Sequence, residues 1–166
     1  SISPKNESLR VYAEMILMNR EKVFDVFMHK DIHFDSGKTY GLIGEYMQGN
    51  IFVSYLLGGQ VRHQGLILLK NGKCITKDEL NNISWCTEPI GTKNENLIVG
   101  KAIKKALKQE FVKDSFDEIK ELFMLTEDRL GNRLKCLSGE RWRASMAIGY
   151  CLGKKISVSY THLTLP

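Results

Sequence analysis

The sequence predicts an α/β fold, and three patterns lead to that prediction. The apolar residues 39–43 run into a glycine-rich loop that a second apolar run follows, which is the order strand, loop, helix. Alternating apolar and polar residues around this unit predict a small antiparallel β region. From residue 99 onward, apolar residues recur at helical spacing. With 166 residues, the chain could bury roughly 70% of the surface that its unfolded form exposes, so we expect one domain with a substantial core.

Two short strands are expected in the segment that leads to the glycine-rich loop. Residues 23–34 mix apolar and polar side chains in near alternation, which is typical of a half-buried strand. Residues 35–38, Asp-Ser-Gly-Lys, have the composition of a turn. Residues 39–43 would then form the second strand and enter the loop.

After the loop, residues 51–57 are long enough to form a helix, and the pair Gly58-Gly59 would end it. Residues 65–73 predict a strand that closes in an Asn-Gly turn, and residues 74–75 would open the next strand.

A polar stretch at residues 76–79 follows, and residues 83–87 predict a short strand that ends before Pro89. Helices are predicted over residues 99–108 and 116–123, with Ser115 placed to cap the second one.

A polar connector is expected at residues 129–135. Residues 140–152 predict a further helix that Gly153 ends.

The glycine-rich loop has the frame of a phosphate-binding loop but lacks two of its usual side chains. Gly44 and Gly49 have the spacing of G-x-x-x-x-G-K-[ST], with Asn50 in place of the lysine and Ile51 in place of the hydroxyl. Backbone N–H groups at the start of the next helix could still hold a phosphate. Taken alone, two glycines at this spacing more often mark a tight turn, and apolar residues such as Met47 favour packing over ligand contact.

A second motif lies at the predicted start of the last helix. Its residues are Leu137, Ser138, Gly139, Glu140 and Arg141, and a basic and then alanine-containing helix follows. This motif resembles the L-S-G-G-Q signature of ATP-binding cassette (ABC) proteins. With the glycine loop before it, and a hairpin, a short strand and a helical insert between them, residues 23–156 resemble the nucleotide-binding subunit of an ABC transporter.

The resemblance implies a P-loop NTPase-type cassette core with a small antiparallel β region and a helical insert at about residues 97–137. A partial cassette would cover residues 1–156 and stop where the Walker B strand is expected. The Walker B aspartate, the catalytic glutamate and the switch histidine then have no assigned position. Residues 157–166 change to a mix rich in Thr, Ser and Leu without helix or strand pattern, and we expect a non-native tail there.

The resemblance also assigns site residues. Glu88 falls at the Q-loop position, where the family's glutamine contacts the metal and the attacking water. Ser138 and Gly139 match signature residues that contact the γ-phosphate of a nucleotide held by a second cassette. Glu140 replaces the second glycine of the signature or marks its deletion. In a purely structural interpretation, Glu140 is an acidic residue at a helix start and Arg141 is a solvent-exposed base. The nucleotide-binding set is Gly44, Glu45, Tyr46, Met47, Gln48, Gly49, Asn50, Ile51 and Phe52.

ATP and Mg²⁺ are the cofactors that the resemblance implies. The implied partners are a second ABC cassette, in a homo- or heterodimer, and a transmembrane permease that places the chain at the cytoplasmic face of the cell membrane. ATP bound between the cassettes would drive the permease. Because Asn50, Ile51 and Glu88 depart from the family pattern, we expect this chain's own site to be weak or inactive in hydrolysis. The alternative is a non-catalytic, ABC-like adaptor or regulatory module.

The composition limits the kinds of site, partner and cellular setting that we expect. Four cysteines without a C-x-x-C pair indicate neither a zinc site nor a disulfide framework, and they favour a reducing, cytoplasmic setting. No apolar run approaches the ~20 residues of a membrane helix.

The net charge of +5 could favour nucleic acid as a partner, but the lysines at 101, 104, 105 and 108 have the spacing of a solvated helix face. We therefore do not expect a nucleic-acid partner, and a cassette that acts on ribosomes is a third, weaker hypothesis. No metal site is expected at His29 and His33, because residues four apart on a strand do not meet as ligands.

Overall fold

The computed structural model describes residues 8–20, 23–41, 57 and 67–159. The chain divides into two compact units, Ser1–Leu80 and Asn81–Pro166. The domain limits expected from the sequence, residues 1–156 and 157–166, stay a prediction.

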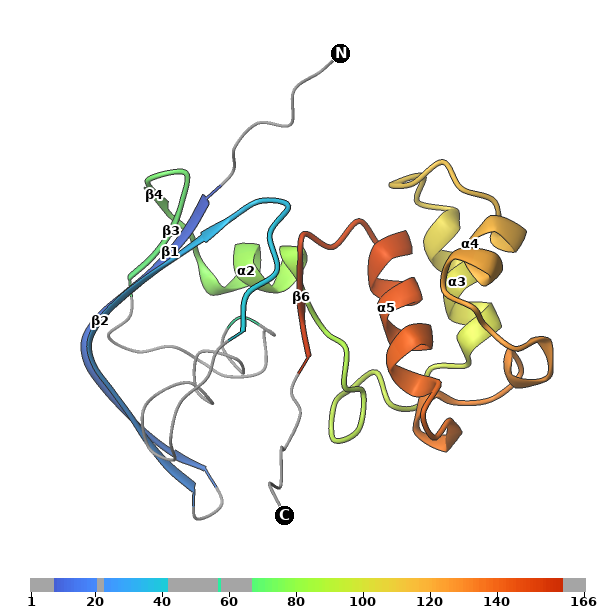
Figure 1. Ribbon diagram of the computed structural model, residues 1–166, viewed down its shortest axis with the longest axis horizontal. Coiled ribbons are helices and arrows are strands. Elements are labelled where there is room, and N and C mark those ends of the chain that lie inside the picture. Colours follow the sequence, from blue (N-terminus) through green and yellow to red (C-terminus); the bar gives the residue numbers. More distant parts are fainter. Residues whose placement is uncertain (1–7, 21–22, 42–56, 58–66, 160–166) are drawn as a thin grey trace. The chain divides into compact units, whose positions relative to one another are not determined.

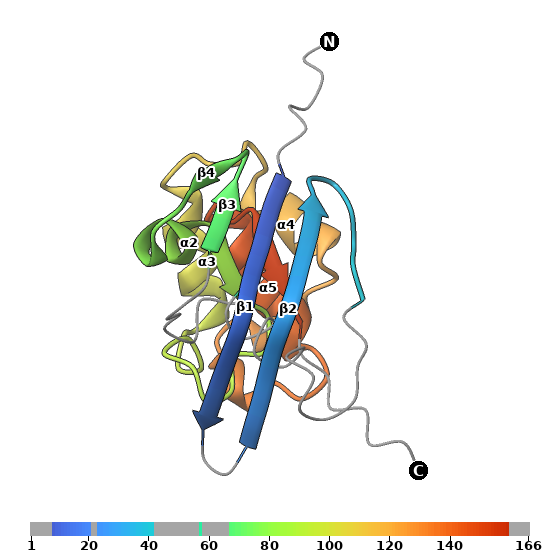
Figure 2. The same cartoon turned by 90° about the vertical axis from the view of Figure 1, so that its left-hand side faces the viewer.

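The first unit contains a four-stranded antiparallel sheet in the order β2-β1-β3-β4. Its strands are β1 (Ser8–Arg20), β2 (Val23–Asp35), β3 (Ile67–Lys70) and β4 (Lys73–Cys74). β1 pairs with β2 from Ser8 opposite Asp35 to Arg20 opposite Val23, and Figure 2 shows the two long strands side by side with β3 next to β1. The strand expected over residues 23–34 is confirmed as β2, whereas β1 was not predicted.

The predicted Asn-Gly turn is confirmed between β3 and β4. Asn71 and Gly72 have φ angles of 52° and 78°, the left-handed values that a tight two-residue hairpin turn requires. The two strands pair with Leu69 opposite Cys74. The hairpin therefore follows from local turn chemistry, which is why the sequence predicts it well.

The strand expected over residues 39–43 is wrong at residues 39–41, which form no strand. The cause is a fold-back onto the end of β2. The Asp35 backbone N–H donates to the Tyr40 hydroxyl at 2.8 Å, and the Tyr40 ring packs edge-on against Phe34 with centroids 5.1 Å apart. Residues 42–43, the glycine loop and all but the last residue of the helix expected over 51–57 lie outside the described residues. That last residue, Leu57, is helical and buried.

Helix α2 (Lys77–Ile83) replaces the polar stretch expected at residues 76–79. Its start carries a reciprocal capping box: the Thr76 N–H donates to Glu79 Oε2 at 2.6 Å, and the Glu79 N–H donates to Thr76 Oγ1 at 3.2 Å. The T-x-x-E signal was present in the sequence. It was missed because the segment is too short and too polar to show helical periodicity.

The second unit contains a two-stranded parallel sheet of β5 (Ser84–Cys86) and β6 (Ile156–Val158). β5 confirms the short strand expected over residues 83–87. We expected no strand after residue 156, and this prediction is wrong, because Ser157 and Val158 belong to β6. The Thr87 N–H donates to the Val158 carbonyl at 2.9 Å and extends the pairing beyond β5.

Three helices complete the second unit and confirm the predicted ones: α3 (Val99–Leu107), α4 (Phe116–Leu122) and α5 (Arg141–Cys151). α3 packs against both α4 and α5 (Figure 1). Two short 3-10 helices, η1 (Glu127–Arg129) and η2 (Leu134–Cys136), lie between α4 and α5. The connector expected at 129–135 is therefore not uniformly polar, since Leu134 is fully buried.

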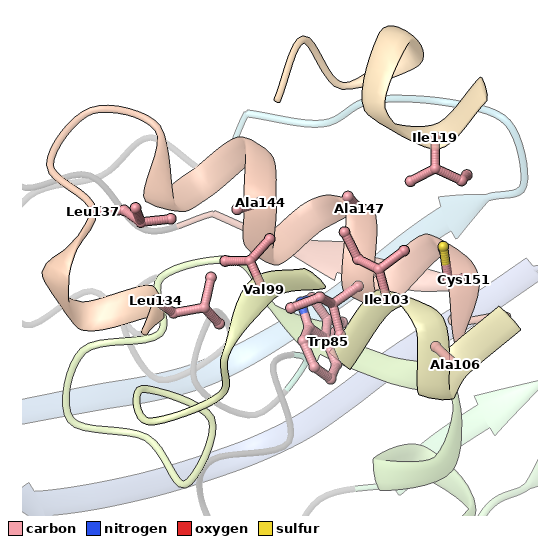
Figure 3. Packing of buried hydrophobic residues seen from close by; sticks show 11 residues of the cluster. Trp85, Val99, Ile103, Ala106, Ile119, Leu134, Leu137, Ala144, Ala147 and Cys151 are labelled. Atoms are coloured by element: carbon pink, nitrogen blue, oxygen red, sulfur yellow. The ribbon is translucent and has the colours of Figure 1, made fainter. Parts of the chain in front are cut away.

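The core of this unit consists of apolar side chains from β5, η2 and the three helices. Small residues on α5 let it approach α3 closely, and Figure 3 shows Ala144 and Ala147 of α5 near Val99 and Ile103 of α3. The cluster comprises Trp85, Val99, Ile103, Ala106, Ile119, Leu134, Leu137, Ala144, Ala147, Ile148 and Cys151.

Three helix ends show how their backbone groups are satisfied. Ser115 and Glu118 form the capping box of α4, which confirms the predicted cap. α3 begins without a side-chain cap, and the N–H of Gly100 instead donates to the Leu130 carbonyl at 2.8 Å. At the end of α5, Gly153 has a φ of +65°, and the N–H groups of Gly153 and Lys154 return to the carbonyls of Tyr150 and Gly149 as in a Schellman motif.

Candidate functional site

The residues that match the signature lie where the last helix begins, as predicted: residues 137–140 lead into α5, and Arg141 is its first residue. Leu137 is buried in the core and anchors this loop from beneath, while Ser138 and Gly139 are exposed. A Cβ atom added to Gly139 would meet nothing within 4 Å. Ser138 and Gly139 therefore form an open, accessible surface on an anchored base.

The first turn of α5 holds no acidic residue. Arg141 and Arg143 both lie in it, and Arg141 is paired with the carboxylate of Glu88. The N-cap residue Glu140 makes no side-chain hydrogen bond to the helix end, and the Arg141 N–H reaches the Ser138 carbonyl only at 3.4 Å. Because the N–H groups and the dipole of a helix start favour negative charge, this end is suited to an anion such as a phosphate.

The Glu140 carboxylate turns away from the helix end and binds the segment after α4. It accepts hydrogen bonds from the Thr126 N–H at 2.6 Å and from the Thr126 hydroxyl at 3.0 Å, and Arg129 Nε lies 3.6 Å away. The side chain is only 7% exposed. Glu140 is thus more than an acidic residue at a helix start, because its carboxylate joins the start of α5 to the segment after α4.

Glu88 lies two residues beyond the end of β5 and binds Arg141 and Trp142 in the first turn of α5. Arg141 Nε lies 3.1 and 3.2 Å from the two Glu88 carboxylate oxygens, and Arg141 Nη2 lies 3.0 Å from Oε2. Trp142 Nε1 donates to Oε2 at 2.8 Å, and the Ile90 N–H donates to Oε1 at 3.1 Å. The structure therefore joins the predicted Q-loop position to the signature through one carboxylate.

Arg141 is not the solvent-exposed base of the purely structural interpretation. Its side chain is 22% exposed, its guanidinium lies 4.4 Å from the centre of the Trp142 ring, and its Nη1 donates to the Ser138 carbonyl at 3.2 Å. One side chain thus contacts Glu88, Trp142 and the exposed loop.

The pKa of Glu88 reflects two opposed effects. Burial disfavours the carboxylate and by itself would raise the pKa, but hydrogen bonds from Arg141, Ile90 and Trp142, together with the charge of Arg141, lower it below the usual glutamate value. The folded protein therefore holds Glu88 in its ionised form.

β5 is joined to α5 by a further buried contact that sequence reasoning missed. Trp85 Nε1 donates to Ser145 Oγ at 3.1 Å, and the Ser145 hydroxyl lies 3.5 Å from the Cys86 carbonyl. Thr126 was also missed as the partner of Glu140, and Trp142 as a partner of Glu88. No local signal identifies them, because their partners lie 14 and 54 residues away in the chain.

The glycine-loop residues lie outside the described residues. They are Gly44, Glu45, Tyr46, Met47, Gln48, Gly49, Asn50, Ile51 and Phe52, and their assignment stays a prediction.

Within the described ranges, no group of three or more His, Cys, Asp or Glu side chains could hold a metal ion. The same part of the chain contains no helix that is both long and apolar enough to cross a bilayer. The lysines at 101, 104, 105 and 108 are all exposed, as expected for a solvated helix face.

Comparison with known proteins gives a similarity to a solved structure. No protein-family model and no curated protein matches the chain. Among solved structures, the chain is similar to a bacterial Atm1-family ABC exporter determined with ATP bound, with a TM-score of 0.64 and 13% sequence identity. The match covers 96% of this chain and 30% of that chain, so the protein spans less than a third of the exporter's length. At this identity the similarity is one of fold.

Proposed function

We propose that this chain is part of an ABC-type ATP-binding cassette and that its signature loop contributes to an ATP site between paired cassettes. The observation that carries the proposal is the start of α5, where exposed Ser138 and Gly139 precede a helix end that has no side-chain cap and no acidic residue in its first turn. The fold similarity to part of an ATP-bound ABC exporter supports the same conclusion.

The chain's own residues would act by binding and orientation. The Ser138 hydroxyl, the Gly139 backbone and the N–H groups at the start of α5 would receive phosphate oxygens, whose negative charge the helix end favours. Buried Leu137 and the bonds of Glu140 and Arg141 hold these groups in position before any ligand arrives. Such preorganisation lowers the cost of binding.

Glu88 does not fit the role of a magnesium ligand. The carboxylate of Glu88 already accepts from Arg141, Trp142 and Ile90, so its oxygens are not available as ligands of a cation. We therefore assign no step of hydrolysis to this chain.

The chain's own glycine loop would bind nucleotide weakly in this proposal. A hydrogen bond to a charged group contributes roughly 1.5–3 kcal/mol, so Asn50 in place of lysine would weaken binding about 10- to 150-fold. The chain would then contribute mainly its signature, to a partner cassette of the same or another sequence, and a permease would link the pair to the cytoplasmic face of the membrane.

A non-catalytic adaptor is the second candidate, and the occupied carboxylate of Glu88 favours it over an active ATPase. An adaptor would keep the cassette shape for docking and bind no nucleotide.

Calorimetric titration of the full chain with ATP separates the two functions. We expect saturable binding that Gly139→Asp weakens by at least about tenfold, because a carboxylate would occupy the space meant for phosphate. The variant should fold, since the site has room for a side chain and a negative charge near a helix start is favourable. Gly131→Asp is the matched control, as Gly131 is also exposed and open. Wild-type protein that does not bind ATP would support the adaptor.

A further inference from the structure

We propose that Glu88 is a positioning residue that fixes Arg141 and, through it, the signature loop, and that it does not act as a metal ligand. This inference rests on the proposed role of Ser138 and Gly139 in contacting ATP.

The first argument is that the acceptor capacity of the Glu88 carboxylate is used within the protein. Two oxygens offer about four acceptor positions. Arg141 Nε and Nη2, Trp142 Nε1 and the Ile90 N–H occupy them at 2.8 to 3.2 Å. A metal ion could bind here only by displacing a charge-assisted bond, which is among the stronger interactions in a protein.

The second argument is that the contact continues to the exposed loop. Arg141 uses Nε and Nη2 for Glu88 and Nη1 for the Ser138 carbonyl. A planar guanidinium holds these bonds in fixed relative directions. The orientation of the Ser138 carbonyl therefore depends on where Glu88 holds Arg141.

The third argument is that Glu140 fixes the same helix start to a different segment. Glu140 binds Thr126, whereas Arg141 binds Glu88, so adjacent residues are tied to the segment after α4 and to the segment after β5. Two ties from different segments restrict rotation of the helix start more than one tie does. Loss of the Glu88 tie should loosen the loop without unfolding the core beneath it.

Glutamine at position 88 would not serve in this role. Its amide has one acceptor oxygen and an NH₂ group, and the NH₂ group would face the N–H donors of Arg141 or Trp142. Glu88→Gln therefore tests positioning directly, because it also restores the residue type expected at the Q-loop position.

The indole N–H resonances of the two tryptophans provide the first readout. Trp142 Nε1 binds Glu88, whereas Trp85 Nε1 binds Ser145 inside the core. In Glu88→Gln, we expect the Trp142 resonance to shift and its hydrogen exchange to accelerate at least about tenfold, while the Trp85 resonance stays unchanged. Unchanged behaviour of the Trp142 resonance would overturn the proposal.

ATP affinity, measured by titration of the full chain with ATP in the presence of Mg²⁺, provides the second readout. We expect Glu88→Gln to weaken ATP binding about tenfold. Arg141→Lys keeps the charge but loses the planar fork, and it should change both readouts in the same direction. Asp117→Asn is the control, since it removes an exposed ion pair with Lys120 on α4 and should change neither.

The outcomes separate this inference from the proposed function. If wild type binds ATP and Glu88→Gln binds it equally well or more tightly, the positioning role is overturned and the proposed function stands. If wild type does not bind ATP, the proposed function fails, and the Trp142 resonance of Glu88→Gln alone decides whether Glu88 positions Arg141.

Discussion

Trp85 and Gly149 touch across the boundary between β5 and α5 so closely that no side chain fits between them. A Cβ atom on Gly149 would lie 2.7 Å from both Cδ1 and Cγ of the Trp85 ring. The same indole donates to Ser145, one turn earlier on α5. β5, which ends two residues before Glu88, is thus seated directly against the helix that begins at Arg141, and this contact gives the ion pair of Glu88 and Arg141 a rigid base.

Gly149→Ala should destabilise the second unit although alanine is the better helix former. The gain of up to about 1 kcal/mol in helix propensity is opposed by overpacking against the Trp85 ring, which costs about 1–3 kcal/mol and has little room to relax in the core. Urea unfolding followed by tryptophan fluorescence measures this, because both tryptophans of the chain lie in the unit. Met146→Ala on the exposed side of α5 is the control and should change stability by no more than about 0.5 kcal/mol. An alanine variant as stable as wild type would show that the contact is loose.

Glu140→Ala should cost about 2 kcal/mol in the same unfolding assay. The substitution leaves the Thr126 N–H and hydroxyl without their acceptor and removes the partner of Arg129. Thr126→Ser keeps both donors and should be close to wild type. If Glu140→Ala left the free energy of unfolding unchanged, the Glu140 carboxylate would not join η1 to α5 as its contacts indicate.

Acidification should weaken the second unit partly through Glu88. Its pKa is lower in the folded chain than in the unfolded chain, since the bonds from Arg141, Ile90 and Trp142 outweigh burial. The resulting stability is fully present above the ordinary glutamate pKa of about 4.3 and is lost as the pH falls through the folded value. Between about pH 6 and about pH 3, Glu88→Gln should therefore lose less stability than wild type. Parallel loss in the two proteins would contradict the assigned pKa direction.

Cys151 should resist alkylation while the protein is folded. Burial, assisted by the nearby charge of Asp114, raises the pKa of Cys151 to about 11, so the reactive thiolate is scarce at neutral pH. Cys74 and Cys136 are exposed and should react first with iodoacetamide, as read by mass spectrometry of the modified peptides. Equal rates at Cys151 and Cys136 in native protein would mean that the helix packing around Cys151 opens readily.

Local chemistry explains which elements could be predicted from the sequence. The α4 cap at Ser115 and the Asn71-Gly72 turn depend on neighbouring residues, and both are confirmed. α2 carries the same kind of capping signal at Thr76 but lacks apolar periodicity, so it was missed. β6 was missed because its pairing with β5 depends on residues about 70 positions earlier.

The position of residues 137–141 at the start of the last helix was predicted, whereas their contacts were not, and their role as a site stays a prediction. The family resemblance identified Glu88 and Arg141 as two separate features, and their separation of 53 residues leaves no local trace of the ion pair between them. The same holds for Glu140 and Thr126. Whether a signature residue binds solvent, ligand or another segment is decided by tertiary packing, which propensity and spacing do not report. The cassette assignment of the whole chain stays a proposal.

Residue-resolved NMR of the full chain during titration with ATP tests the central claim most directly. The account predicts that the largest amide shift changes fall on residues 138–143, at the exposed loop and first turn of α5, and that they saturate. Shift changes that avoid this segment, or none at all, would contradict the claim that the start of α5 receives the phosphate of ATP.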